Sequence, residues 1–436
     1  MAKIGCAVIS AGGKGTRLQS VLGNAIPKPM VPILGKPILQ YQLENLASYG
    51  VSKLYILIGH LSDVVRSYFG NGKSFGIDIE YVQEDEPLGT GGALFYLKNK
   101  ISSDFIFLYG DLLLNIDFGK FFEFHSLAKK AITLFSHPNS HPFDSDLLVV
   151  KEDGNISKWD SKHNDRSGYY YKNLTNAGLY VLSPKIFERF IELKKVDFEK
   201  DILIPLIDKN DVASYQSSEY VKDIGTPVRY EQAKKDLEEG IVNQKNLSNK
   251  QKAIFLDRDG VINKYVGFLT DIDKFELEDG SAEAIKKINQ SGYLAIVITN
   301  QPVIARGEVT FDELQNIHNK METLLGKHGA YLDGIYFCPH HPHAGYDGEI
   351  KELKIDCDCR KPKTGMLIKA MNDFNLDLSE CFFIGDSFID MRTAENAGVR
   401  GILLNGGVPK KLEDIYPSKI NKKCINLLDA VNYILK

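Results

Sequence analysis

Short apolar runs alternate with amphipathic stretches along most of the chain. The first half has runs typical of buried strands at residues 6–10, 53–59, 104–111, 131–136 and 177–183. Residues 36–50 and 183–193 have apolar positions at helical spacing, and Gly50 is a typical C-terminal signal for the first of these helices. This alternation predicts a mostly parallel sheet flanked by helices.

The same alternation returns in the second half, with strand-like runs at residues 253–260, 293–301, 334–340, 381–387 and 400–407. The stretch between the halves is polar and has no apolar period, so we interpret residues 241–251 as a linker. The pattern predicts an α/β protein with two Rossmann-like α/β domains in tandem, residues 1–240 and 252–436. Because the halves carry different motifs, we interpret the chain as a fusion and not a duplication.

Composition narrows the classes of protein. The 436 residues are 43% hydrophobic and 25% charged, as in ordinary globular proteins, and the net charge of −4 argues against a general nucleic-acid surface. No apolar stretch is long enough to span a bilayer, and the N-terminus lacks the pattern of a signal peptide. We therefore expect a cytoplasmic protein with small-molecule substrates and no membrane partner; an oligomer is possible, but the sequence does not indicate its size.

A glycine-rich segment, "VISAGGKGTRL" (residues 8–18), follows the first predicted strand. Such glycines allow a tight turn whose backbone N–H groups face phosphates, and Arg17 adds positive charge, although a plain strand-to-helix turn would look alike. The segment lacks the G-K-[ST] ending of a P-loop. Lys28 stands between two prolines, Asp111 ends a buried strand, Asp223 precedes a turn, and residues 84–94 form a second glycine loop.

Together these motifs resemble the sugar-1-phosphate nucleotidylyltransferases over residues 1–240. The resemblance implies attack of a sugar 1-phosphate on the α-phosphorus of a nucleoside triphosphate. It implies phosphate contacts from Arg17 and Lys28, and Mg²⁺ on Asp111 and Asp223. It further implies nucleotide or sugar contacts from Gly12, Gly13, Gly15, Thr16, Gly89, Thr90, Asn176, Ala177 and Gly178.

One departure from this family concerns the lysine that contacts the sugar phosphate. The family usually has an F-x-E-K-like strand there, whereas this chain reads "ISKWDSKHND". Lys158 and Lys162 both remain candidates.

In the second half, "AIFLDRDGVIN" places Asp257 and Asp259 two residues apart at the end of a strand, so both project to one face. Two carboxylates this close repel each other when both are ionised, so both stay charged at low free-energy cost only if a cation lies between them. Thr299 and Asn300 end the next strand, "CRKPKTGM" supplies Lys361, and "FFIGDSFIDM" supplies Asp386, with Asp390 four residues on.

This set resembles the haloacid-dehalogenase (HAD) superfamily over residues 252–405. The resemblance implies that Asp257 is a nucleophile and Asp259 a general acid and base. Thr299 and Lys361 would hold the phosphoryl group. Mg²⁺ would lie on Asp257, Asp386 and the backbone carbonyl of Asp259. Too few residues separate the first two strands for a large cap domain.

Three of the six cysteines cluster in "CPHHPHAGYDGEIKELKIDCDCR" (residues 338–360). Cys338, His340, Cys357 and Cys359 supply three thiolates and one imidazole, a closed shell typical of structural Zn²⁺, while His341 and His343 would lie in the loop. The absence of C-x-x-C disfavours a redox role. The arrangement resembles that of heptose 1,7-bisphosphate and histidinol phosphatases, which implies substrate contacts from Arg306 and Arg360; Pro302 and Val303 replace small residues usual there.

The fusion favours a sugar bisphosphate over histidinol phosphate, since removing a 7-phosphate would leave the 1-phosphate that the first domain uses. The expected product is a nucleotide-activated heptose, and a resemblance to heptose-1-phosphate guanylyltransferases implies GDP-D-glycero-α-D-manno-heptose. Another sugar or base remains an alternative, as does a phosphatase joined to a degenerate, regulatory transferase domain.

Overall fold

The computed structural model describes residues 4–12, 26–404 and 420–436. It divides the chain into two compact units. Unit 1 comprises residues 1–137, 148–160 and 175–248, and unit 2 comprises residues 138–147, 161–174 and 249–436. Two short segments from the first half of the sequence therefore belong to unit 2, with the phosphatase-like motifs.

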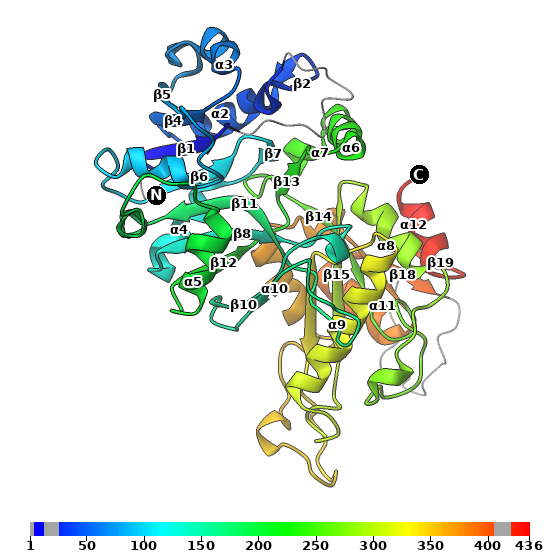
Figure 1. Cartoon of the computed structure of the whole chain (residues 1–436). Helices are drawn as coiled ribbons and strands as arrows, with labels where there is room; N and C mark the ends of the chain where they lie inside the picture. The colour runs from blue at the N-terminus through cyan, green and yellow to red at the C-terminus, as the bar shows by residue number, and fades with distance from the viewer. Residues whose placement is uncertain (1–3, 13–25, 405–419) are drawn as a thin grey trace. The chain divides into compact units, whose positions relative to one another are not determined.

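Within its described residues, unit 1 is built on a mixed sheet of nine strands with the path β10-β9-β11-β6-β1-β4-β5, to which β8 and β12 add through β11 (Figure 1). Its parallel part contains β1 (Cys6–Ser10), β4 (Lys53–Ile58), β5 (Asp78–Gln83) and β6 (Phe105–Tyr109). The other strands are β8 (Ile132–His137), β9 (Leu147–Val150), β10 (Ile156–Asp160), β11 (Thr175–Leu182) and β12 (Val212–Gln216). The predicted α/β core is confirmed, but the sheet is mixed and not mostly parallel, because β11 pairs antiparallel with β6 and with β8.

Helices α2 (Ile38–Ser48), α3 (Ser62–Phe69) and α4 (Phe118–Ala128) pack apolar residues into the same core as these strands. Helix α2 ends as predicted, because Gly50 has a left-handed φ of 79° and its N–H bonds to the carbonyl of Ala47. Shorter elements complete the unit: β2 (Pro32–Ile33), β3 (Lys36–Pro37), α5 (Ile204–Ile207), α6 (Pro227–Glu238) and α7 (Ile241–Gln244).

The helix expected over residues 183–193 is only a 3₁₀ turn, Pro184–Arg189. Beyond Arg189 the chain leaves helical geometry, and at Val196 it pairs with the second glycine loop. The N–H of Val196 bonds to the carbonyl of Leu88 at 2.9 Å, and the N–H of Gly91 bonds to the carbonyl of Val196 at 3.0 Å. A tertiary contact thus overrides the local helical period.

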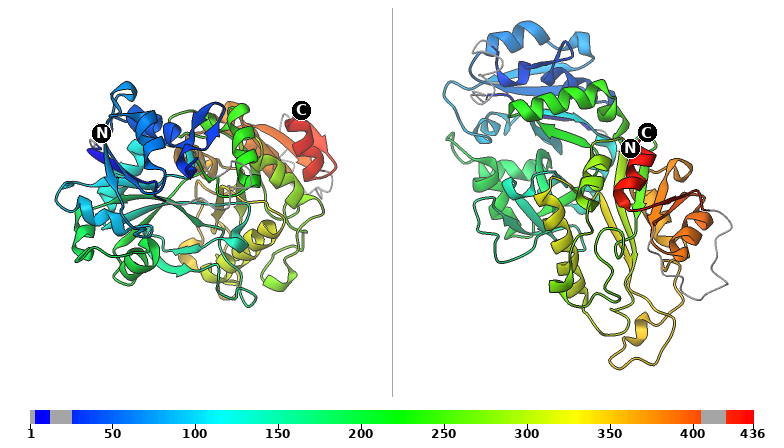
Figure 2. Two further views of the ribbon diagram at one scale, coloured as in Figure 1. Left: turned by 45° about the horizontal axis from the view of Figure 1, so that its top comes forward. Right: turned by 90° about the vertical axis from the view of Figure 1, so that its right-hand side faces the viewer.

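Unit 2 is built on a parallel sheet of order β16-β15-β14-β17-β18-β19. The strands are β14 (Lys252–Leu256), β15 (Tyr293–Asn300), β16 (Gly334–Cys338), β17 (Phe382–Gly385), β18 (Arg400–Leu404) and β19 (Lys422–Cys424). Helices α8 (Ser281–Asn289), α9 (Phe311–Lys327) and α12 (Leu427–Ile434) share one apolar cluster with the sheet, and α10 (Gly365–Phe374) and α11 (Phe388–Ala397) share another (Figure 2). This is the three-layer arrangement that the second set of apolar runs predicts.

In the segment predicted to connect the domains, Ile241 and Val242 lie in a small apolar cluster of unit 1. The backbone N–H of Leu247 bonds to Glu219 at 2.9 Å, and β14 begins at Lys252.

Candidate active sites and metal centre

The acidic site of unit 2 lies at the carboxyl ends of its central strands. Asp257 follows β14, and its N–H bonds to the carbonyl of Ile384 on β17. The Lys361 ammonium is buried between two carboxylates, 2.9 Å from Asp257 Oδ1 and 2.6 Å from Asp390 Oδ1. Burial alone would lower the pKa of Lys361, but these two carboxylates outweigh it and raise the pKa.

Asp257, Asp386 and Asp390 bring one carboxylate oxygen each within 4.8 Å of one another. Burial raises the pKa of Asp257 to about 7 and that of Asp386 to about 6, and the nearby charge of Asp390 adds to both shifts. Crowded carboxylates that resist ionisation fit a divalent cation with oxygen ligands. Asp390, to which the sequence pattern gave no role, belongs to this group.

Asp259 has different partners. Its carboxylate accepts bonds from Arg258 at 2.9 Å, from Asn263 at 3.0 Å and from Gln301 at 3.0 Å. Burial would raise the pKa of Asp259, but the fully buried Arg258 outweighs this and the net pKa is lowered. The side chain of Asp259 is therefore oriented apart from the three-carboxylate group, as expected if only its backbone carbonyl meets a metal.

The other predicted residues of this half converge on the same place. Thr299 and Asn300 end β15, and Asn300 clamps the backbone of Lys361 through bonds of 3.0 and 3.1 Å. A cavity of about 420 Å³ is lined by the following predicted residues: Asp257, Asp259, Thr299, Asn300, Arg306, Arg360, Lys361 and Asp386.

Arg306 is held by stacking at the cavity wall. Its guanidinium lies 4.0 Å from the Phe268 ring centre and 4.5 Å from that of Tyr346, and its buried Nε has no hydrogen-bond partner in the described structure. An unpaired buried donor is costly, which is consistent with a ligand that accepts a bond there.

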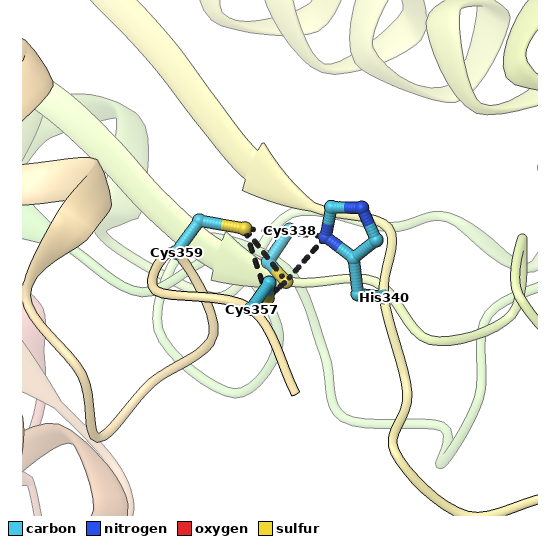
Figure 3. Close-up of side chains that lie close together, drawn as sticks. All are labelled: Cys338, His340, Cys357 and Cys359. Atoms are coloured by element: carbon cyan, nitrogen blue, oxygen red, sulfur yellow. Dashed lines mark hydrogen bonds between the residues drawn. The ribbon is translucent and has the colours of Figure 1, made fainter. Parts of the chain in front are cut away.

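The cysteine cluster is confirmed as a compact group of four ligand atoms (Figure 3). The sulfur atoms of Cys338, Cys357 and Cys359 lie 3.2–3.5 Å apart, and His340 Nδ1 lies 3.3 Å from Cys359 Sγ. These spacings approximate the edges of a tetrahedron with metal–sulfur bonds of about 2.3 Å. The group therefore fits a metal ion of the kind that thiolate and imidazole prefer.

This cluster connects the long loop after β16 to the acidic site. Cys338 pairs in register with Asn300, the residue that clamps Lys361. Arg360 follows Cys359 directly and donates a 3.1 Å bond to the carbonyl of His340. A metal that fixes these four ligands would also fix the residues that line the cavity.

In unit 1, Lys28, Asp111 and Asp223 converge. Lys28 forms an ion pair with Asp111. Asp111 directly precedes β7 (Leu112–Asn115), which pairs with β13 (Tyr220–Asp223) so that Asp223 lies opposite Leu112. Burial would raise the pKa of Asp223, but Arg229, whose Nη1 lies 2.7 Å away, and then Lys28 outweigh it and lower the pKa. The two aspartates predicted for Mg²⁺ are thus close in space, at the ends of paired strands.

The glycine loops are described in part. Gly13, Gly15, Thr16 and Arg17 lie outside the described residues. A Cβ on Gly12 would lie 3.2 Å from the carboxylate of Glu84. Glu84 is buried, and the sequence analysis gave this residue no role. In the second loop, Gly89 has a left-handed φ of 80°, and the Thr90 hydroxyl accepts the N–H of Phe198 at 2.8 Å.

The predicted sugar-side residues lie on β11. Asn176 donates to the hydroxyl of Tyr180 at 2.7 Å and accepts the N–H of Gly178 at 3.2 Å. Tyr180 and Tyr109 both donate to the half-buried Glu199, which the sequence analysis also missed. Of the two candidate lysines, Lys158 belongs to β10 and Lys162 follows that strand; both are exposed, so the choice stays open.

Each unit thus has a group of acidic side chains, and the one in unit 2 lies beside the thiolate cluster. A nucleotidyl transferase family model matches residues 6–240, and a HAD-hydrolase-like model matches residues 358–429. The D-glycero-beta-D-manno-heptose-1,7-bisphosphate 7-phosphatase of Yersinia pestis is 40% identical over 163 residues, covering 37% of this chain and 84% of that protein.

The chain belongs to the nucleotidyl transferase family and also to the family of these bisphosphate phosphatases. It therefore carries both a nucleotidyltransferase and a phosphatase domain.

Two solved structures are similar to parts of the chain. HddC from Yersinia pseudotuberculosis is 30% identical, with a TM-score of 0.47 over 54% of this chain and 100% of that one. The D,D-heptose 1,7-bisphosphate phosphatase from B. bronchiseptica, complexed with magnesium and phosphate, is 30% identical, with a TM-score of 0.36 over 42% of this chain and 98% of that one. Among the described residues, no helix has the length and apolar character needed to cross a membrane.

Proposed function

We propose that the protein makes a nucleotide-activated heptose in two steps. It removes the 7-phosphate of D-glycero-D-manno-heptose 1,7-bisphosphate, then joins a nucleotidyl group, GMP from GTP, to heptose 1-phosphate. The observation that carries this proposal is the union, in one chain, of a nucleotidyl transferase half with the Asp257–Lys361 site of a family whose relatives act on heptose bisphosphate.

For the phosphatase step, we propose that the Asp257 carboxylate attacks the 7-phosphorus while the bond to the sugar oxygen breaks. Asp259 gives that oxygen a proton, then takes a proton from the water that cleaves the aspartyl-phosphate and releases phosphate. Because Arg258 lowers its pKa, Asp259 favours the ionised form that takes the proton from water, and its minor protonated form is the acid in the first half of the step. Thr299 and Lys361 would hold the phosphoryl oxygens.

Mg²⁺ held by Asp257, Asp386, Asp390 and the backbone carbonyl of Asp259 would neutralise charge on the phosphoryl group. The cysteine cluster would hold Zn²⁺ in a structural role, because its four protein ligands leave no open position for substrate. Arg306 and Arg360 would contact the sugar phosphate, which would give the buried Nε of Arg306 a partner.

For the transfer step, we propose that an oxygen of heptose 1-phosphate bonds to the α-phosphorus of the triphosphate, and the bond to the β-phosphate oxygen breaks. This chemistry depends on in-line positioning and on charge neutralisation. Lys28 and Arg17 would contact the phosphates, and Asp111 and Asp223 would hold Mg²⁺. Gly89 and Thr90 would lie near the base, and Asn176 and Gly178 near the sugar.

The test is a matrix of sugar phosphates against nucleoside triphosphates, scored for phosphate and for pyrophosphate. Both heptose anomers belong in it, since the curated relatives act on the β form whereas the sequence resemblance implies an α product. We expect phosphate from heptose 1,7-bisphosphate, and pyrophosphate from heptose 1-phosphate with GTP. Release of phosphate with no pyrophosphate from any pair would leave the chain a phosphatase with an inactive transferase half.

A further inference from the structure

Helix α9 of unit 2 is buried on two sides. One side packs Ile317, Met321 and Leu325 into the apolar core. A helix at the surface of a domain ordinarily buries one such stripe. On α9, however, Lys320, Glu322, Thr323 and Gly326 are buried as well.

Residues 138–147 and 161–174, here called the strap, cover this second side. Thr323 binds the backbone of Tyr171 twice: its hydroxyl accepts the Tyr171 N–H at 2.9 Å and donates to the Tyr171 carbonyl at 3.2 Å. Close approach at Gly326 adds to this contact, because a Cβ there would lie 2.5 Å from Cγ of Pro142. The ammonium of Lys320 lies 5.5 Å from the ring centre of Tyr170.

The two parts of the strap also hold each other. Arg166 donates to the carbonyls of Pro142 and Ser145, each at 2.9 Å. Asn173 and Asn139 exchange bonds of 2.7 and 3.1 Å between side chain and backbone. Apart from the 3₁₀ turn Pro142–Asp144 and Leu147, the first residue of β9, the strap has no helix or strand of its own, so these bonds and the contacts with α9 contribute to its order.

The position of the strap in the chain links it to the transfer reaction. Residues 161–174 connect β10 to β11. Lys162, a candidate for the sugar phosphate, is the second residue of this segment, and the segment ends two residues before Asn176, a proposed sugar contact. Because the segment contains Lys162 and continues directly into β11, movement of the strap would displace these residues, and displacements of about 1 Å at a reacting group are costly.

We propose that α9 is an anchor that positions the sugar-phosphate-binding segment of the transferase, so that nucleotidyl transfer to a sugar 1-phosphate depends on a helix of the phosphatase unit. This inference rests on the proposed transferase function. Thr323 and Gly326 are then positioning residues, because they act through the strap and contact no substrate.

The test uses two variants of the full-length protein, Gly326→Ala and Thr323→Val. Alanine is a better helix former than glycine, so Gly326→Ala retains α9 while its methyl group displaces the strap. Thr323→Val keeps the shape and removes both bonds to Tyr171. Gln315→Ala, on the exposed side of α9, is the matched control.

Each variant is assayed for the KM of heptose 1-phosphate, for phosphatase kcat/KM, and for the rate of tryptic cleavage after Lys162, Arg166 or Lys172. Because Thr323→Val removes two hydrogen bonds, we expect the KM to rise by roughly ten- to thirtyfold and strap cleavage to accelerate similarly, with phosphatase kinetics unchanged. The control should match wild type in all three assays.

Cleavage reports on the anchor whatever the substrate, so failure of the anchor and failure of the proposed function are distinguishable. Unchanged strap cleavage in both variants would overturn the anchor. Faster cleavage with unchanged transfer kinetics would overturn its role in positioning. Absence of pyrophosphate release by the wild type would overturn the proposed function and with it this role, while the cleavage assay would still decide whether α9 holds the strap.

Discussion

At the scale of single residues, two neighbouring carboxylates are tuned in opposite directions. Burial raises the pKa of Asp257 to about 7, whereas Asp259 has a lowered pKa although it is as deeply placed. The difference is Arg258, which has no solvent-exposed surface and binds Asp259 through three nitrogen–oxygen contacts of 2.9–3.2 Å. Asp257 instead shares Lys361 with a second carboxylate.

The first prediction concerns this buried arginine. Arg258→Met leaves Asp259 buried without its partner, so we expect the phosphatase unit to lose about 3 kcal/mol of unfolding free energy. Arg392→Met, which removes a partly exposed ion pair with Glu395, should cost under about 1 kcal/mol. Urea unfolding measures the loss of unfolding free energy in both variants. Equal losses would show that Arg258 does not stabilise a buried charge.

A second prediction concerns Glu322 on α9. Burial raises its pKa from 4.5 to about 7, against an opposing effect of Lys172. Because the folded pKa lies above the unfolded one, ionisation is harder in the folded state, and wild type should lose stability relative to Glu322→Gln as the pH rises from about 4.5 to about 7. Above pH 7 the difference should be constant. Parallel stability–pH curves for the two proteins would contradict the buried, ionisable state of Glu322.

At the scale of elements, the cysteine cluster gives order to a long loop. The segment between β16 and α10 has one 3₁₀ turn, Lys351–Leu353, and projects from the sheet as the gold loop of Figures 1 and 2. Ile350 and Leu353 of this loop pack against a small apolar cluster, and a closed metal shell can add to that limited core. The loop ends at Arg360 and Lys361, which line the cavity.

The third prediction tests this element. Cys357→Ser should lower both the zinc content, about one ion per chain in wild type, and the phosphatase activity, while nucleotidyl transfer continues. Cys6→Ser, at an isolated cysteine of unit 1, is the control and should keep its zinc. Elemental analysis of protein purified without added metal provides the measurement. Full zinc retention by Cys357→Ser would remove that residue from the shell.

Some elements of the protein could be predicted from its sequence and others could not. The strands and the Asp257, Lys361 and Cys338–Cys359 groupings were predictable, because strand ends and short motifs are local. The role of Asp390 was not, since Lys361 meets it across 29 positions of sequence. Neither was that of Glu199, whose partners Tyr109 and Tyr180 lie on β6 and β11. The strap could not be predicted from the sequence, because its residues have no helical or strand periodicity. Its partner, α9, lies about 150 positions further along the chain.

At the scale of the whole molecule, the chain passes between the two units more than once, since residues 138–147 and 161–174 belong to unit 2. The fourth prediction therefore concerns fragments. Residues 1–240 and 252–436 should each fold when expressed alone, because each has its own apolar core. Fragment 1–240 keeps the strap without α9, so its KM for sugar 1-phosphate should rise, as in Gly326→Ala. A fragment with wild-type kinetics would argue against the anchor.

A physical argument predicts the order in which the two reactions occur. A sugar pocket shaped for a neutral hydroxymethyl end would have to bury an unpaired 7-phosphate, which is costly, so the phosphatase should act first. The most direct test supplies heptose 1,7-bisphosphate and GTP to Asp257→Asn and to Asp111→Asn. Asp257→Asn removes the nucleophile with little change in volume, so phosphate release should fall by several orders of magnitude.

We predict that Asp257→Asn makes no GDP-heptose from the bisphosphate but recovers with heptose 1-phosphate, and that Asp111→Asn accumulates heptose 1-phosphate. Rapid formation of GDP-heptose 7-phosphate by Asp257→Asn would contradict the account.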